Sequence, residues 1–446
     1  MTQSMEHLRD SLTRLGDAAR RHKDLQFNNL LHHITLDCLF QAFYHLNKQA
    51  AKGVDEQDWH SYAEGLAQHL PRLHQQVQSG RYRAQAIKRV WIPKADGSPR
   101  PIGITSIEDK IVQQAVVWVL EAIYEQDFLG FSYGFRPNRS QHQALDAVYM
   151  AISVKKVGWI IDADLKAFFD TLNHDWMTRF LEHRIADRRV LRLIKGWLTA
   201  KVQDGKQSQK SSLGTPQGGV ISPLLANIYL HYVLDLWVQQ WRKRRSCGDV
   251  YIVRYADDFI IGCQYRDDAE GLLHAIKQRF AKFALSLNEQ KTKLIEFGRF
   301  ARQNRAQRGQ SKPDTFDFLG FTHVCGEALS SGKFMLKRYT IKKKARAFLA
   351  RVKLFIRNGI CYSPYAVGNK LKQILTGYFN YFAIPGNQAR IGMIRTEVCK
   401  YWLRTLRRRS QKGRTFSWRR LKGLVMLFIP HTRVRHPYPN QRLVVK

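Results

Sequence analysis

The sequence is short of the features that mark secreted and membrane proteins. Its six cysteines are scattered, without a Cys-x-x-Cys pair, which fits reduced thiols and argues against a zinc site built from cysteine pairs. No apolar run approaches the roughly 18 to 20 residues of a membrane span. The first ten residues, MTQSMEHLRD, lack the apolar core of a signal peptide. We therefore expect a cytoplasmic protein.

Acidic residues are also scarce relative to basic ones. The chain has 73 Lys and Arg against 36 Asp and Glu, a net charge of +37. The excess is uneven, because residues 341–446 carry 25 Lys and Arg and a single acid, Glu397. A charge that served only solubility would be spread more evenly. The pattern favours a nucleic-acid partner, with an anionic membrane surface as the next alternative.

The rest of the composition is that of a folded chain. With 446 residues and 44% hydrophobic residues, the sequence can form two or three domains and a large core. We expect an α+β fold in three regions: a helical N-terminal extension over 1–52, helices alternating with short strands over 53–337, and basic helices over 338–446. The polar run RQNRAQRGQSKPD, residues 302–314, predicts a loop or linker.

Two adjacent carboxylates interrupt an apolar run in VYIVRYADDFIIGC, residues 250–263. The segments 250–253 and 259–261 are uncharged and rich in β-branched and aromatic residues, which predicts two buried strands joined as a hairpin. Asp257 and Asp258 then lie at its tip. An isolated Asp-Asp between strands is more often an exposed turn than a site, so this pattern alone leaves both interpretations open.

A second acidic cluster lies in GWIIDADLKAFFDTLNH, residues 158–174. A strand over its first half has a period of two, which places Asp162 and Asp164 on one face and the apolar residues on the other. Asp170 follows near the start of an expected helix. The ordinary alternative is an Asp-rich strand end followed by a helix N-terminus.

Considered together, the two clusters favour a metal site. Carboxylates that converge from different strands repel one another unless cations neutralise them, and Mg²⁺ prefers such oxygen ligands while keeping water and substrate phosphates. Two such ions about 4 Å apart can activate an attacking hydroxyl and stabilise a leaving pyrophosphate. A tight hairpin would hold Asp257 and Asp258 rigidly against the first cluster.

These motifs resemble those of a known polymerase family. Tyr255-Ala256-Asp257-Asp258 resembles the YxDD signature of reverse transcriptases, and residues 164–169 resemble the first metal-binding motif of the same enzymes. Further stretches resemble the group II intron-encoded branch, in the family's order, and the resemblance extends from about residue 51 to the C-terminus. They are AKGVDE (51–56), WIPKADGSPRPIGITSIEDKIVQQA (91–115), YGFRPNRS (133–140), GTPQGGVISPLLANIYL (214–230), LSLNEQKTKLIEFG (285–298) and FDFLGF (316–321).

The resemblance implies a right-hand polymerase. Its parts would be fingers, a ferredoxin-like palm with the YADD hairpin, and an α-helical thumb or maturase domain. The implied reaction extends a primer 3′-hydroxyl on an RNA template with deoxynucleotides and two Mg²⁺ ions, or Mn²⁺ in their place. Asp164, Asp257 and Asp258 would be the catalytic metal ligands. Asp164 is preferred to Asp162 because this family has an aromatic residue five positions after the metal-binding Asp, and Phe169 stands there.

The resemblance also implies residues that bind the nucleotide. The ring of Phe169 would lie beneath the incoming sugar and exclude a 2′-hydroxyl; the alternative is an ordinary core aromatic. Lys94 and Arg100 lie on a predicted hairpin, where a point charge and a planar fork can hold a triphosphate; the alternative is a solvated basic hairpin. Gln217, in a Gly/Pro-rich loop, has an amide that can contact the nucleotide or the template backbone.

Other basic residues of this region have less specific contexts. Arg136 and Arg139 in FRPNRS are expected to contact template phosphates. Lys291 or Lys293 in QKTKL resembles a lysine near the triphosphate in related polymerases, and a basic connection between a helix and a strand explains the pair as well.

The C-terminal segment interleaves aromatic residues with arginines. The aromatic residues of 378–382 are expected to pack a helical core rather than to stack on bases. Arg404, Arg407 and Arg408, in a run that also includes Arg409, cannot all be buried and should lie along phosphates or in solvent. The segment resembles the thumb or maturase domain of group II intron proteins, which binds the primer-template and the intron RNA.

Many relatives continue beyond the thumb into a DNA-binding region and an HNH nuclease. This sequence ends at Lys446 without paired cysteines, so it resembles the endonuclease-lacking type, for which priming from a nick or a replication fork is expected. The expected partners are an RNA template, a DNA or RNA primer, deoxynucleotides and group II intron RNA, with no membrane and with nucleoid association during work on DNA. Two alternatives stay open: an RNA-binding maturase used mainly for splicing, and a domesticated polymerase in DNA repair or phage defence.

Overall fold

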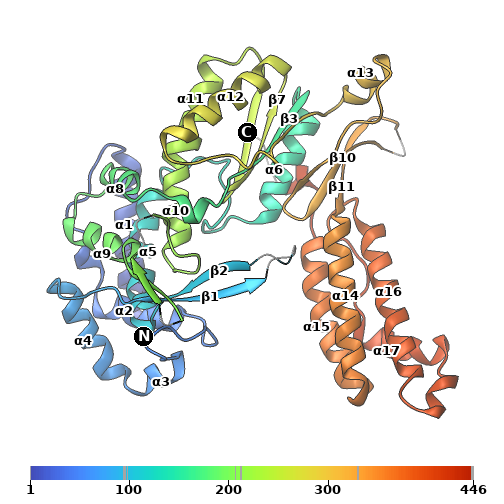
Figure 1. The fold of residues 1–446 in the computed structure, drawn as a ribbon, viewed down its shortest axis with the longest axis horizontal. Helices are drawn as coiled ribbons and strands as arrows, with labels where there is room; N and C mark the ends of the chain where they lie inside the picture. Colours follow the sequence, from blue (N-terminus) through green and yellow to red (C-terminus); the bar gives the residue numbers. More distant parts are fainter. Residues whose placement is uncertain are drawn as a thin grey trace.

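The chain folds into three packed parts around three sheets (Figure 1). In the view of Figure 1, a central sheet lies at the top, the N-terminal helices lie below it on the left, and the C-terminal helices, orange to red, stand on the right. The computed structural model describes residues 2–93, 97, 99–205, 207–210, 213–328 and 331–442.

The central sheet is antiparallel and has the order β6-β7-β3-β8. Its strands are β3 (Trp159–Asp164), β6 (Val250–Tyr255), β7 (Asp258–Cys263) and β8 (Lys293–Glu296). Both strands predicted around the Asp-Asp pair and the strand predicted before Asp164 are therefore confirmed. Their near-continuous apolar sequence is explained by packing, because both faces of this sheet are covered.

Alternate residues of the strands serve two different cores. Ile160 and Ile260 face helix α6 (Gln141–Val154), where they pack in one core with Leu145 and Val148 of that helix. Ile161 and Ile261 face the opposite side. There they join helix α12 (Arg266–Lys282), whose Leu272, Ile276 and Phe280 recur at helical spacing.

A second sheet, of order β2-β1-β4-β5, forms the N-terminal part with its helices. Its strands are β1 (Ile87–Pro93), β2 (Pro99–Ile104), β4 (Lys201–Asp204) and β5 (Gln207–Lys210). The helices of this part are α1 (Thr2–Arg21), α2 (Leu36–His45), α3 (Trp59–Glu64), α4 (Leu66–Gln78), α5 (Ile107–Tyr124), α7 (Phe168–Thr171), α8 (His174–Glu182) and α9 (Arg188–Leu198). Helix α10 (Ser222–Leu230) leads from this part toward the central sheet, and α11 (Leu236–Arg244) lies next to α12 in the view of Figure 1. A π-helical turn, η2 (His231–Asp235), joins α10 to α11.

Helix α5 is the centre of this part. Its sequence IVQQAVVWVL is apolar on almost every side, which is the pattern of a helix that is buried all round. Helices α1 and α2 both pack on it, and Gly16 of α1 comes close to the carbonyl of Ala122. The helices expected as an N-terminal extension over 1–52 thus share one core with α5 and with one face of the central sheet.

The third sheet connects the central sheet to the C-terminal helices. It has the order β11-β10-β9, with β9 (Phe316–Phe318), β10 (Phe321–Glu327) and β11 (Phe334–Thr340). The helices that follow are α14 (Lys342–Asn358), α15 (Pro364–Phe382), α16 (Gln388–Arg407), α17 (Trp418–Phe428) and α18 (Pro439–Arg442). In α14 only Phe348, Val352 and Ile356, four residues apart, are buried, so the basic residues of this helix face outward.

The aromatic residues of 378–382 pack as predicted. Tyr378 and Phe379 are buried in the core of the C-terminal helices, and Phe382 packs against it. The run 302–314 departs from the prediction of a loop, because residues up to Gln307 form helix α13 (Ala301–Gln307). Its helix-compatible residues Ala, Arg and Gln outweigh the local polarity on which the prediction relied.

The last residues of the described chain return to the central part. The backbone nitrogen of Arg435 donates to the carbonyl of Ala383, and Arg442 of α18 lies 3.3 Å from a carboxylate oxygen of Asp146 on α6. The other oxygen of Asp146 pairs with Arg338 of β11 at 3.1 Å, and both of these side chains are nearly inaccessible to solvent. Asp146 therefore joins the central part to both the third sheet and the C-terminal tail.

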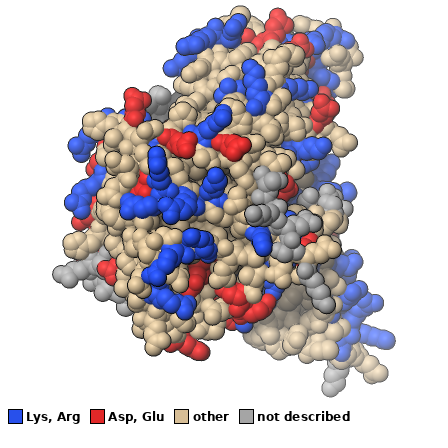
Figure 2. All heavy atoms as spheres, turned by 60° about the vertical axis from the view of Figure 1, so that its left-hand side comes forward, with Lys and Arg blue, Asp and Glu red and all other residues tan. Residues whose placement is uncertain are grey.

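The surface is basic without being uniform. Figure 2 shows a face on which blue Lys and Arg side chains alternate with red Asp and Glu. The C-terminal helices differ, since Glu397 is the single acid from residue 341 onward. None of the helices that the structure describes is long and apolar enough to cross a membrane.

The Asp146 junction yields a stability prediction. Asp146→Ala leaves Arg338 buried without its partner, which should lower the free energy of unfolding by on the order of 3 kcal/mol. The combined change Asp146→Leu and Arg338→Met, which removes both charges, should recover most of this loss. Urea unfolding followed by circular dichroism measures it. As a control, Glu270→Ala in the exposed Arg266–Glu270 pair should cost less than about 1 kcal/mol; equal costs for both alanine variants would contradict the prediction.

Candidate active site

The tip of the β6–β7 hairpin is a two-residue turn. Tyr255 and Asp258 are the last paired residues, so Ala256 and Asp257 form the connection. Ala256 has a φ of 58°, a left-handed conformation that a residue with a Cβ adopts at an energetic cost. The turn thus presents two successive carboxylates at the end of two buried strands, as the sequence predicted.

The neighbouring strand β3 brings a third carboxylate to the same end. Asp164 is the last residue of β3 and lies directly opposite Asp258 in the antiparallel register. Directly opposed residues have Cβ atoms about 4.5–5.5 Å apart, so their carboxylates interact. Asp162 lies two residues further from the tip, opposite Ile260. Asp164, Asp257 and Asp258 therefore come together from two separate stretches of sequence.

The carboxylates affect one another's ionisation. Burial raises the pKa of Asp258 to about 8, and the charges of Asp162 and Asp164 contribute to the shift. Burial also raises the pKa of Asp257, and the charge of Asp164 adds to this. The pKa of Asp162 rises to about 6 because of burial and the nearby Asp317. Without a cation, Asp258 is therefore mostly protonated at neutral pH, because its surroundings do not compensate the charge of every carboxylate in the cluster.

One lysine already acts as a counter-ion to the cluster. The Lys291 ammonium lies 2.6 Å from Oδ2 of Asp164, and this contact is the largest cause that raises the pKa of Lys291. The side chain of Lys291 is 66% exposed, so it can leave Asp164 without unfolding any part of the chain. The sequence left open whether Lys291 or Lys293 lies near the triphosphate. Of the two, Lys291 forms the ion pair with Asp164.

The donor set fits a divalent cation. Among the described residues, no three acidic, His or Cys side chains are already spaced as ligands of one ion, and one oxygen of Asp164 is engaged by Lys291. The chemistry nevertheless suits Mg²⁺, which prefers one or two carboxylates and completes its shell with water and substrate phosphates. The raised pKa values of Asp257 and Asp258, and the Lys291 ammonium in contact with Asp164, both indicate that a cation would be stabilised here.

Two of the residues predicted to bind the nucleotide are in contact. The Arg100 guanidinium on β2 donates through Nε to Oε1 of Gln217 at 2.8 Å. The carbonyl of Gln217 accepts from the backbone nitrogen of Gly103, at 2.6 Å, which ties the Gly-rich loop to β2. Arg100 is also close enough to lower the pKa of Asp257 against the larger effect of burial. Lys94 lies outside the described residues.

Phe169 lines a small cavity between the second sheet and this loop. The cavity has a volume of about 240 Å³, and Gln217 and the backbone of Gly214 also line it. The carbonyl of Phe169 accepts from the backbone nitrogen of Thr215 at 2.7 Å. Its ring is half-buried and packs against the main core, so one edge remains available beside the loop.

Arg136 has a different position from the one expected for a template contact. Its guanidinium is 3% exposed and pairs with Glu125 at 2.9 Å. It also donates to the carbonyls of Leu129 and Ser132, at 2.8 and 2.7 Å. A buried guanidinium with these partners holds the loop closed and does not reach a template phosphate. Arg139 is exposed and lies over the ring of Tyr133, so the expectation for it stands.

The three arginines predicted on the C-terminal helices lie together at the end of α16. Arg404, Arg407 and Arg408 are all exposed. The Nε group of Arg407 donates to the carbonyl of Phe416 at 2.8 Å, which joins α16 to the segment before α17. Their position leaves the remaining guanidinium donors free to meet a polyanion.

Sequence reasoning missed Arg254, which lies three residues before the acidic pair. It is fully buried in β6 and contacts Asp235, Asn227 and the turn itself. A signal was present in VYIVRY, because a charged residue inside an otherwise apolar strand requires a buried partner. That partner is distant in sequence and could not be identified from the pattern.

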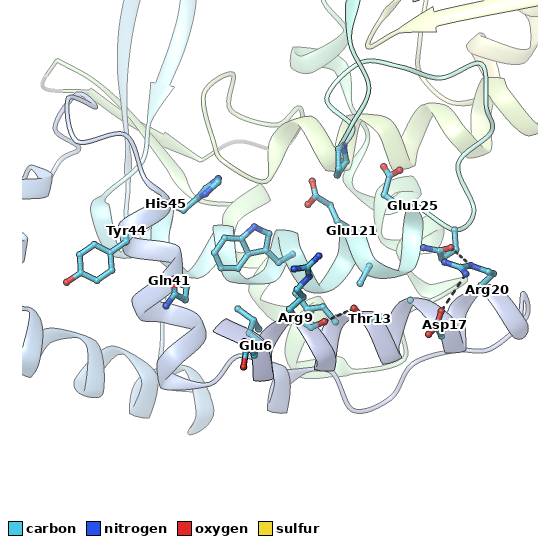
Figure 3. Close-up of a pocket in the computed structure, with 17 residues that line it drawn as sticks. Glu6, Arg9, Thr13, Asp17, Arg20, Gln41, Tyr44, His45, Glu121 and Glu125 are labelled. Carbon is cyan, nitrogen blue, oxygen red and sulfur yellow. Dashed lines mark hydrogen bonds and ion pairs between the residues drawn. The ribbon is translucent and has the colours of Figure 1, made fainter. Parts of the chain in front are cut away.

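A larger cavity lies away from the carboxylates. It has a volume of about 940 Å³ and is bounded by α1, α2 and α5, with Tyr44, His45, Glu121 and Glu125 among its lining residues (Figure 3). Burial and the charge of Glu125 raise the pKa of Glu121 to about 7. Because none of the predicted site residues lines it, this cavity is separate from the carboxylate site.

Comparison with known proteins agrees with this geometry. Residues 92–323, more than half of the chain, match the family described as "Reverse transcriptase (RNA-dependent DNA polymerase)". The matched segment contains all three clustered aspartates. It also contains Arg100, Phe169 and Gln217.

Relatives, some of them with intron-related names, are among the matches. Protein YkfC of Escherichia coli is 34% identical over 54% of this chain and 71% of its own length. Group II intron-encoded protein LtrA of Lactococcus lactis is 34% identical over 52% of this chain, but the match spans only 39% of LtrA. Nuclear intron maturase 2 of Arabidopsis thaliana is 31% identical over 33% of this chain and 25% of its own length. The resemblance to the group II intron branch is thereby confirmed, and the chain belongs to the reverse transcriptase family of RNA-dependent DNA polymerases.

Proposed function

We propose that this chain is a reverse transcriptase of the group II intron type, which extends a primer 3′-hydroxyl on an RNA template with deoxynucleotides. The observation that carries the proposal is the register of β3 and β7, which places Asp164 opposite Asp258 while Asp257 lies in the adjoining turn. Three carboxylates at one sheet end, beside a basic hairpin and a Gly-rich loop, suit nucleotidyl transfer better than simple RNA binding, which needs no such cluster.

Asp164, Asp257 and Asp258 would hold the divalent ions. When bound, two such ions supply activation of the attacking hydroxyl and stabilisation of the leaving pyrophosphate. Lys291 would then leave Asp164 and carry its charge toward the incoming phosphates. Mg²⁺ is the proposed ion, with Mn²⁺ as a possible substitute.

The parts of the fold are proposed to correspond to a right hand. The chain order of the central sheet, second-third-first-fourth strand with crossing helices, supports a ferredoxin-like palm. The sheet β2-β1-β4-β5 with its helices would form the fingers, and α14–α17 the thumb. The boundaries near residues 52 and 337 remain part of the proposal.

Nucleotide selection is assigned to the residues on the finger side. Arg100, oriented by Gln217, would hold the triphosphate, and by resemblance Lys94 would share this role. Phe169 would press against the sugar and exclude the 2′-hydroxyl of a ribonucleotide. Its position beside Gln217 at the small cavity supports this assignment.

The basic helices are proposed to bind the primer-template and a folded intron RNA. Recognition of A-form duplexes relies on backbone charge and shape rather than on base identity, which exposed arginines such as Arg404, Arg407 and Arg408 can provide. Arg139 would contact the template. Support for splicing comes from the names of LtrA and of the Arabidopsis maturase, both matched over a minority of their length. The site of action would be the cytoplasm, on the nucleoid during DNA synthesis.

Removing two carboxylates tests the central claim. Asp257→Ala with Asp258→Ala should reduce primer extension on an RNA template by several orders of magnitude. Without these carboxylates the site would not hold the divalent ions that bind the primer hydroxyl and the nucleotide phosphates. Binding of the primer-template, measured by fluorescence anisotropy, should stay close to wild type. Asp267→Ala, an exposed acid on α12, is the matched control. Equal synthesis by the double variant and the control would refute the proposal.

The raised pKa of Asp258 predicts a pH-dependent stability. Its folded pKa, about 8, exceeds its ordinary value of 3.8, so its contribution to stability is complete below about pH 3.8 and is lost as the pH rises to 8. In EDTA, Asp258→Asn should therefore melt at a higher temperature than wild type at pH 8.5, by a margin that shrinks at pH 5.

Added Mg²⁺ should narrow the same margin at pH 8.5, because it stabilises wild type more than Asp258→Asn. Differential scanning fluorimetry measures these shifts, and Asp267→Asn is the control. If the difference in melting temperature between wild type and Asp258→Asn changed with neither pH nor Mg²⁺, the assignment of Asp258 as a metal ligand would be contradicted.

Phe169 yields a prediction on sugar selection. Phe169→Ala should raise the relative use of ribonucleotides by about 10- to 100-fold, since a site that excludes one hydroxyl sterically loses that discrimination when the ring is removed. Single-nucleotide incorporation kinetics with dNTP and NTP measure the ratio. Phe169→Tyr keeps the ring and should keep the selectivity; a gain by both variants would argue for a general packing role.

A further inference from the structure

Arg254 and Asp235 form an ion pair beneath the catalytic turn. Both side chains are 0% exposed. The guanidinium donates through Nε to Oδ1 of Asp235 at 2.7 Å and through Nη2 to Oδ2 at 2.5 Å, a bidentate arrangement. Such a pair is costly to bury and gives weak support to stability by itself, because apolar residues of similar volume often serve as well. Its presence calls for a role beyond stability.

The third nitrogen of the guanidinium reaches the turn. Nη1 of Arg254 donates to the carbonyl of Ala256 at 3.0 Å and to Oδ1 of Asn227 at 3.0 Å. The Ala256 carbonyl belongs to the peptide that joins the two residues of the turn, so its direction sets the orientation of Asp257. The bond also fixes the peptide that follows Ala256, whose positive φ a two-residue hairpin turn requires.

The opposite side of the turn is held by the segment 131–134. The Nδ2 group of Asn227 donates to the carbonyl of Gly134 at 2.7 Å, so one amide links this segment to Arg254. A Cβ at Gly134 would clash with the backbone nitrogen of Ala256. The backbone of Arg254 pairs with the same segment, through bonds of 2.9 and 2.8 Å to Phe131 and Tyr133.

The partner carboxylate comes from an irregular helix. Asp235 is the last residue of the π-helical turn η2, between α10 and α11. A π turn inserts one extra residue into the helical repeat and so redirects the side chains that follow, and such turns are frequent at functional sites. Here it accompanies a buried carboxylate directed at a strand residue that is nearly twenty positions later in the sequence.

We propose that Arg254 is a positioning residue: anchored on Asp235 and Asn227, it fixes the Ala256 carbonyl and thereby the directions of the Asp257 and Asp258 carboxylates, which sets how tightly the site holds its divalent cations. This inference rests on the proposed function. Lysine cannot replace Arg254, because one ammonium cannot hold the two oxygens of Asp235 and reach the turn in the same plane.

The test separates positioning from stability. In Arg254→Met with Asp235→Leu, apolar side chains replace the ion pair, so the protein should stay folded, but the bond to the Ala256 carbonyl is lost. We expect the Mg²⁺ concentration for half-maximal synthesis to rise about tenfold and kcat to fall about 10- to 100-fold, with unchanged primer-template affinity. Arg254→Lys should show the same direction of change.

A second readout does not depend on synthesis. Binding of Mn²⁺ alone, followed by the electron paramagnetic resonance signal of the free ion, should weaken about tenfold in Arg254→Met with Asp235→Leu. The matched control is Arg338→Met with Asp146→Leu, which removes another buried pair that does not touch the turn. The control should keep wild-type Mn²⁺ affinity, which does not depend on synthesis.

The outcomes are distinguishable. If wild type extends primers and Arg254→Met with Asp235→Leu keeps its Mg²⁺ requirement and Mn²⁺ affinity, Arg254 is structural and the inference is overturned. Equal shifts in this variant and in the control would also overturn it, because any buried pair would then have the same effect. If wild type fails to extend primers while Mn²⁺ binding still weakens only in the Arg254 variants, the proposed function fails and the positioning role stands.

Discussion

Repulsion among carboxylates at one end of a sheet is the constraint on which this structure depends. Asp164 and Asp258 are direct cross-strand partners, and like charges in that relation destabilise an antiparallel pair. The chain does not avoid the conflict, since burial raises the pKa of Asp257 and Asp258 further. It surrounds the cluster with cations instead: Lys291 in direct contact, and Arg100 close enough to lower the pKa of Asp257. Both are exposed and can move, as a site that exchanges ions and nucleotides requires.

Helices cover both faces of the central sheet, which explains why the carboxylate site lies at the ends of its strands. Helix α6 packs on one face and α12 on the other, so alternate residues of each strand are used for two separate cores. The ends of the strands are not covered by these helices, and β3 and the β6–β7 hairpin end at the same place. The arrangement also gives the turn a rigid base, because the strands that carry it cannot shift without disturbing both cores.

Sequence patterns predicted the parts of this site whose signals are local. The β6–β7 hairpin, the strand before Asp164 and the packing of Tyr378 and Phe379 all follow from short-range periodicity. Arg136 was misjudged because a basic residue in a polar loop gives no sign of burial; its partner Glu125 lies beyond the reach of any local pattern. The pairing of Arg254 with Asp235 was missed for the same reason, and the π turn that accompanies it has no simple sequence signature. Local rules reach element type, whereas charge pairing depends on the complete fold.

The acidic cluster and the basic C-terminal segment have opposite charges and different proposed roles. A cluster of acids repels a nucleic acid, so the binding energy for the proposed primer-template would have to come from elsewhere. Residues from 341 onward, with 25 basic residues against one acid, are suited to provide it. A nucleic acid bound there would serve synthesis only if its distance from the carboxylates were fixed. Two connections fix it: the Asp146 junction holds Arg338 and Arg442, and Tyr381 of α15 donates to the carbonyl of Leu319 at 2.7 Å. The second contact reaches close to the site, because the charge of Asp258 contributes to the raised pKa of Tyr381. The basic C-terminal helices are thus bonded to the part of the chain that carries the acidic cluster.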